Sequence, residues 1–153
     1  ATLPAIFSSQ PLQQIIALDT GILHGPANTV LAAKRALEAG ARVLNVDAVL
    51  SGSRLVAAHN ATHRLRSSGF PSFACGDLST CTPQDLDREL SPSCQYSKHY
   101  YLEKGLPPSA LSSMKFCGPQ PLNFVEDFLE HFPQTQIIFD MKSETVAMQH
   151  EAG

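Results

Sequence analysis

Polar and apolar residues alternate over two neighbouring stretches in the first half of the chain. From 42 to 50, Asn45 and Asp47 share one face with valines, while the residues between them form the other face. A Ser-Gly-Ser turn at 51–53 leads into a second alternating stretch at 55–59. The pattern predicts two consecutive strands that place polar side chains on faces about to be buried, where they cost free energy unless satisfied.

Two segments upstream carry other periodicities. Residues 14–18 form a short apolar run that we expect to be a buried strand. Residues 28–40 have apolar side chains at helical spacing. Asn28 or Thr29 is placed to cap this helix, and Gly40 to end it.

A second helix and a further strand are predicted downstream, over 121–133 and 136–142. The expected apolar stripe of the helix consists of Leu122, Val125, Leu129 and Phe132. Asn123 and Glu126 resemble a capping box, and Pro133 marks the end of the helix.

The order of these elements is typical of a β/α protein with a mainly parallel sheet. The 153 residues fit one domain, which we expect to span 1–153. Within it, residues 61–120 predict a long irregular insertion, with one short helix around 83–90.

Composition narrows the function classes. Hydrophobic residues make up 43% and charged residues 16%, which indicates a folded globular chain. The net charge is -3 and the basic residues are scattered, so nothing favours nucleic acid or an anionic membrane surface. The apolar runs are far shorter than the roughly 20 residues of a membrane span, so we expect no transmembrane segment.

The cysteines cluster in the insertion; they are Cys75, Cys81, Cys94 and Cys117. Their even number favours two disulfides and a secreted or extracytoplasmic protein. Four free thiols, or a zinc site that uses His99, are the alternatives. The sequon at 60–62 also fits secretion.

Polar residues lie toward the C-terminal ends of three predicted strands: Asn45 and Asp47, then His59, then Asp140 and Lys142. This end of a β/α sheet is where ligands bind. Two carboxylates from different strands are suited to a hard divalent cation. His59 would then move a proton and Lys142 would face an anionic group, which together describe a metal-assisted phosphate site.

Each residue also has a purely structural interpretation. Asp140 and Lys142 are spaced to form a partly buried ion pair. His59 and Asn60 are placed to form a hydrogen-bonded pair at the end of a strand.

Two blocks of the chain resemble the glycerophosphodiester phosphodiesterase family, within the PLC-like phosphodiesterase superfamily. "IIALDTGILHGPANTVLAAKRALEAGARVLNVDAVLSGSRLVAAHN" resembles the family's I-A-H-R-G, P-E-N-T, E-x-G-A, E-x-D and H-D motifs in order. "PLNFVEDFLEHFPQTQIIFDMK" resembles its later P-T-L-E-E-F-L-x-x-F-P and E-x-K motifs. The resemblance implies a TIM barrel that binds Ca²⁺ or Mg²⁺ and uses two histidines to cleave glycerophosphodiesters.

Four residues keep the chemistry that the resemblance implies. Asp47 stands at the aspartate of E-x-D and is implied to bind metal, His59 stands at the histidine of H-D and is implied to be catalytic, and Lys142 stands at the lysine of E-x-K and is implied to bind substrate. Asp140 replaces a metal-binding glutamate with a shorter carboxylate.

Other positions lose that chemistry. Leu18 stands at the other catalytic histidine, and Asn45 at the first metal-binding glutamate. Further departures are Asp19 for the arginine of I-A-H-R-G, Ala27 for the glutamate of P-E-N-T and Asn60 for the aspartate of H-D. Leucine exchanges no proton, and losing one general acid or base costs on the order of 10²- to 10⁴-fold in rate. His24 as a substitute conflicts with the register that the P-x-N-T motif sets.

These features predict the N-terminal half of a TIM-barrel-like (β/α)8 fold, since a whole barrel needs about 250 residues. We expect a second chain or a downstream segment to complete it, because an open half-barrel exposes strand edges and apolar faces. The predicted function is that of a non-catalytic relative, a pseudoenzyme that serves as a structural or binding component of a larger assembly.

Two alternatives differ in what the site does. One is an active, divergent phosphodiesterase of lipid metabolism that uses Ca²⁺ or Mg²⁺, with Asp19 or a residue from the missing half as base. The other is a lectin-like or lipid-head-group binding module that keeps the pocket without hydrolysis.

Overall fold

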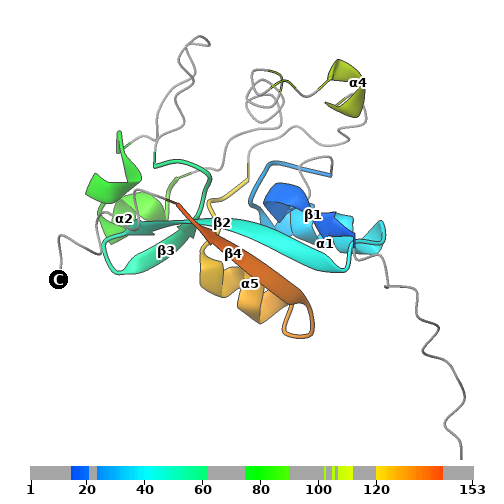
Figure 1. Cartoon of the computed structure of the whole chain (residues 1–153). Coiled ribbons are helices and arrows are strands. Elements are labelled where there is room, and N and C mark those ends of the chain that lie inside the picture. Colours follow the sequence, from blue (N-terminus) through cyan, green and yellow to red (C-terminus); the bar gives the residue numbers. More distant parts are fainter. Residues whose placement is uncertain are drawn as a thin grey trace, which may run out of the picture.

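The fold is organised around one long strand, β2 (Val43–Ser51), with which every other strand of the described residues pairs. The computed structural model describes residues 15–20, 24–61, 75–89, 102, 105, 107–111 and 120–142. Within them the partner strands of β2 are β1 (Ile16–Ala17), β3 (Arg54–Ala57) and β4 (Gln136–Met141). Figure 1 shows β2 running through the middle of these elements.

The two parallel neighbours lie on opposite edges of β2, because β1 and β4 both pair with Val43 and Leu44. β3 is antiparallel and returns through a two-residue turn in which Gly52 has a φ of 57°, a left-handed conformation that glycine adopts without steric cost. The mainly parallel sheet and the predicted hairpin are confirmed. The first strand is shorter than expected, since a 3-10 turn, η1 (Leu18–Thr20), begins directly after Ala17.

The first predicted helix is α1 (Val30–Glu38). Its N-cap is Thr29, whose hydroxyl oxygen accepts a hydrogen bond from the amide of Ala32 at 3.2 Å. Gly40 follows the helix with a φ of 110°, which ends it as the sequence predicts.

Both long helices cover the same face of the sheet. Leu44 and Val46 of β2 pack in one hydrophobic cluster with Ala33 and Ala36 of α1 and with Phe128 of α5 (Val125–His131). In Figure 1, α5 lies against β2 and β4. Because side chains alternate along a strand, Asn45 and Asp47 lie on the opposite face. We call it the helix-free face, because α1 and α5 both pack on the other side of the sheet.

The predicted apolar stripe of the second helix is wrong at Leu129, whereas Leu122 is buried and Phe132 packs against the core. Phe128 is fully buried, whereas Leu129 is 52% exposed. The helix begins only at Val125, while Phe124 is extended and forms a bridge with Val56 of β3. Leu122 therefore lies outside the helix, so its burial does not depend on helical spacing from the later residues.

The predicted capping box of Asn123 and Glu126 is also wrong. Asp127 accepts the hydrogen bond from the amide of Phe124 at 2.8 Å, and Glu126 pairs with Arg54 instead. The side-chain oxygen of Asn123 accepts a hydrogen bond from the amide of Val30 at 2.9 Å, so this residue satisfies a free amide at the start of α1. It thereby joins segments 93 residues apart.

The described part of the insertion forms a second hydrophobic cluster at the far end of β2. Val49 and Val56 pack there with Leu78 of η2 (Leu78–Thr80) and Leu86 of α2 (Pro83–Leu86). The expected short helix starts where predicted and ends earlier, at Leu86. A further short helix, α4 (Pro108–Leu111), was not predicted. None of the helices in the described residues is long and apolar enough to cross a membrane.

One disulfide joins Cys75 to Cys81, with 5.4 Å between their Cα atoms. It lies beside the second hydrophobic cluster, and both cysteines are partly buried against that cluster. Cys94, Cys117 and His99 lie outside the described residues, so the second predicted disulfide and the zinc alternative stay predictions.

Replacing Asn123 with alanine removes its hydrogen bonds to Val30 and Asp127, the second of which spans 3.2 Å. We expect the free energy of unfolding to fall by about 1 kcal/mol, the usual effect of losing a helix cap. Urea denaturation followed by circular dichroism measures this. The matched control is Glu130→Ala on the exposed side of α5, which should change stability by less than about 0.5 kcal/mol. Equal losses in the two variants would contradict the capping role.

Candidate functional site

The site is built around a buried carboxylate on the helix-free face of the sheet. The side chain of Asp47 is 1% exposed. A buried charge is stable only when it is paired and hydrogen-bonded. Two segments of the chain supply those partners, one to each carboxylate oxygen.

The first partner is Lys142, directly after β4. Its ammonium nitrogen lies 2.6 Å from Oδ1 of Asp47 and 2.7 Å from Oδ2 of Asp140. The sheet register produces this arrangement, because Asp47 of β2 and Asp140 of β4 are direct neighbours across the two strands. Burial by itself lowers the pKa of Lys142, but the hydrogen bonds to Asp140 and Asp47 outweigh that effect and leave its pKa raised.

The second partner is Asn28, in the loop before α1. Its amide nitrogen donates to Oδ2 of Asp47 at 2.8 Å, and its side-chain oxygen accepts from the backbone amide of Asp47 at 3.0 Å. Asn28 has a φ of 57°, which asparagine tolerates better than most residues. Sequence reasoning considered this residue only as a helix cap. The signal that pointed to it was the P-x-N-T motif.

His59 lies just beyond β3 and is half-buried. Burial lowers its pKa, and the Lys142 charge acts in the same direction, while Asp47, the hydrogen bond with Asn60 and Asp140 act against it. The predicted site residues Asp47, His59, Asp140 and Lys142 are therefore brought within electrostatic reach of one another. Both structural interpretations also hold, since Asp140 pairs with Lys142 and His59 bonds with Asn60.

Leu18 comes directly after β1, and Asn45 lies on β2. Asn45 shares its face of the sheet with Ile16, because Ile16 of β1 pairs with Val43 of β2. Leu18 opens the η1 turn and its side chain is 53% exposed. Neither residue offers a carboxylate or an imidazole to the site.

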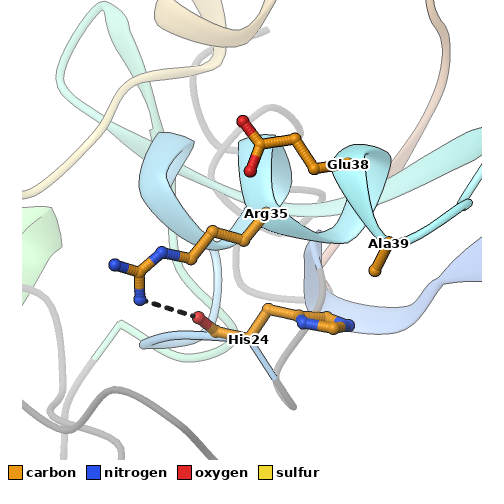
Figure 2. Close-up of a pocket in the computed structure, with 4 residues that line it drawn as sticks. All are labelled: His24, Arg35, Glu38 and Ala39. Carbon is orange, nitrogen blue, oxygen red and sulfur yellow. Dashed lines mark hydrogen bonds between the residues drawn. The ribbon is translucent and has the colours of Figure 1, made fainter.

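His24 belongs to a different surface. It lines an open hollow of about 430 Å³ together with Arg35, Glu38 and Ala39 of α1. Figure 2 shows Arg35 directed at the backbone carbonyl of His24, with 3.5 Å between the guanidinium nitrogen and the carbonyl oxygen. Nothing in this arrangement supports His24 as a substitute for the histidine that Leu18 replaces.

In their present arrangement, the carboxylates of Asp47 and Asp140 do not fit a divalent cation. Ca²⁺ takes six to eight oxygen ligands, and Mg²⁺ usually binds one or two carboxylates together with waters. Here both carboxylates are bonded to one ammonium group. Among the described residues, no group of three or more His, Cys, Asp or Glu side chains is arranged to hold a metal ion.

Solved structures share this fold. A protein assigned as a glycerophosphoryl diester phosphodiesterase from Silicibacter pomeroyi is 16% identical, with a TM-score of 0.64, over 91% of this chain and 48% of that one. The glycerophosphodiester phosphodiesterase from Agrobacterium tumefaciens is 18% identical, with a TM-score of 0.56. The match covers 90% of this chain and 51% of that one. The glycerophosphoryl diester phosphodiesterase from Parabacteroides distasonis is 16% identical, with a TM-score of 0.55. The match covers 91% of this chain and 43% of that one.

No protein-family model matches the chain, and no curated protein matches it. The chain spans about half the length of the solved structures that it resembles. The fold is therefore that of part of a glycerophosphodiester phosphodiesterase barrel.

The lowered pKa of His59 predicts a pH dependence of stability. As the pH falls from about 7 to about 5, the imidazole binds a proton in the unfolded chain before it does so in the folded chain, so its contribution to stability, present above its usual pKa, is lost. His59→Gln should remove this part of the decline. Urea denaturation across the interval measures it, and NMR titration of the imidazole reports its pKa. A pKa at or above that of an exposed histidine would contradict the assignment.

Proposed function

We propose that the chain is a non-catalytic relative of glycerophosphodiester phosphodiesterases that serves as a structural or binding component of a larger assembly. The observation that carries the proposal is the combination of Leu18 with the Lys142 bridge. Leu18 stands where the family pattern has a proton carrier. Lys142, which the family pattern also has, is here bonded to both carboxylates that would hold a metal ion.

Leu18 removes one of the two proton carriers that the family resemblance implies. Its side chain has no ionisable group, and by the sequence resemblance it stands at the first histidine of the family pattern. General acid or base catalysis by one positioned group is worth on the order of 10²- to 10⁴-fold in rate. His24 does not restore it, because it lines the hollow beside α1.

The Lys142 bridge argues against both the metal-dependent and the anion-binding alternatives. The ammonium group already neutralises part of the charge of Asp47 and Asp140. Less negative charge is left to attract a cation, and the positive charge is not free to hold a phosphate or an anionic lipid head group.

An active, divergent enzyme is the second candidate. The observation in its favour is that His59 is half-buried with a lowered pKa beside Asp47 and Asp140, as a proton-transferring histidine would be. Such an enzyme would need a second proton carrier from Asp19 or from residues that complete the barrel.

The helix-free face supports the proposal of a larger assembly. Ile16 is 51% exposed and Ile138 is 43% exposed, and both share this face with Asn45. A closed barrel fills its interior with such side chains. We therefore expect further β/α units, from a second chain or a downstream segment, to cover this face.

The native assembly should not hydrolyse glycerophosphocholine in the presence of Ca²⁺ or Mg²⁺. Released glycerol phosphate, measured by a coupled assay, is expected to stay at the level of the buffer, because Leu18 stands at one of the two proton carriers of the family pattern and Lys142 is bonded to both Asp47 and Asp140. The Agrobacterium tumefaciens phosphodiesterase serves as the positive control.

The matched variant for this assay is His59→Ala. If the chain is non-catalytic, the variant and the unmodified protein give the same background. Metal-dependent turnover that His59→Ala abolishes would overturn the proposal in favour of the divergent enzyme.

Ile138→Arg tests whether the helix-free face is covered in the native assembly. Burying an arginine there should cost several kcal/mol, seen as loss of the assembly in size-exclusion chromatography with light scattering or as a lower melting temperature. Leu129→Arg is the matched control, because Leu129 is a similarly exposed apolar residue on α5. Equal effects of the two substitutions would show that the helix-free face is not specially covered.

A further inference from the structure

We infer that the Lys142 ammonium group is the resident cation of this site and excludes a divalent ion from the space between Asp47 and Asp140. The inference deepens the proposed function, since it concerns the same residues. It does not depend on the absence of turnover, because it concerns what occupies the two carboxylates.

The distances place the ammonium where a bound cation would be. Its nitrogen lies 2.6 Å from Asp47 Oδ1 and 2.7 Å from Asp140 Oδ2. Ca²⁺ lies about 2.3–2.6 Å from its carboxylate ligands. An ion that bridged these two oxygens would therefore overlap the lysine nitrogen, so the two cations compete for one position.

The surrounding structure holds the lysine in place. The backbone amide of Lys142 donates to the carbonyl of Ala48 at 3.1 Å, which fixes the start of its side chain beside β2. The side chain is only 16% exposed. Asp47 cannot rotate freely to release it, because its other oxygen is bonded to Asn28 at 2.8 Å.

The charges explain why the ammonium group is stable in the position that a divalent ion would otherwise take. Two carboxylates and one ammonium leave the site with a single negative charge, and Asn45 adds none where a third carboxylate would stand. A divalent ion that entered beside the ammonium would be repelled by it. Removing the ammonium leaves two uncompensated carboxylates, one of them buried, which is a strong attraction for a cation.

The experiment compares Mn²⁺ binding by the unmodified chain, Lys142→Met and the control Lys34→Met. Lys34 is an exposed residue of α1, so its variant makes the same change in net charge away from the site. Electron paramagnetic resonance of free Mn²⁺ gives the bound fraction. We expect Lys142→Met to bind at least about tenfold more tightly than the other two proteins.

Two further measurements keep the outcome decisive. Adding Asp47→Asn to Lys142→Met should abolish the gain in binding. If Lys142→Met unfolds without metal, Ca²⁺ should restore its melting transition and leave that of the unmodified chain unchanged.

The inference is overturned if the unmodified chain binds Mn²⁺ as tightly as Lys142→Met and loses that binding with Asp47→Asn. It is also overturned if Lys142→Met gains nothing over Lys34→Met. Neither result concerns turnover, so failure of this inference and failure of the proposed function are told apart by the separate hydrolysis assay.

Discussion

The buried carboxylate of Asp47 is the constraint on which the described structure depends. A charge with 1% exposure requires a partner for each oxygen, and those partners come from the loop before α1 and from the residue after β4. Asn28, Asp47 and Lys142 thus tie together three segments far apart in the sequence. The strand register is part of the same constraint, because the pairing of Asp47 with Asp140 brings both carboxylates within reach of one ammonium group.

The two faces of the sheet differ in role: one stabilises the fold, and the other carries the candidate site. One face packs Leu44 and Val46 against α1 and α5 and is a closed hydrophobic core. The other carries the polar cluster together with Ile16 and Ile138, which are about half exposed. Burial of apolar surface is the main source of stability. The helix-covered face therefore supplies most of the stability. The opposite face carries the polar cluster, and it is the face that we propose further β/α units cover.

The sequence was sufficient for the features set by local pattern. Period-two alternation placed Asn45 and Asp47 on one face, and the cap and stop residues bounded α1. The sequence was insufficient where contacts between distant segments determine which side chains are buried and which hydrogen bonds form. Phe128, not Leu129, packs in the core, where α5 meets the sheet and α1. Asn28 and Asn123 act across long separations, which neighbouring residues alone do not reveal.

A crystal structure of the chain grown in millimolar Mn²⁺, with anomalous data, tests the central claim most directly. The account predicts no anomalous peak between the two aspartates, and a lysine nitrogen within hydrogen-bond distance of both. A manganese ion bound to Asp47 and Asp140, with Lys142 turned away, would contradict it.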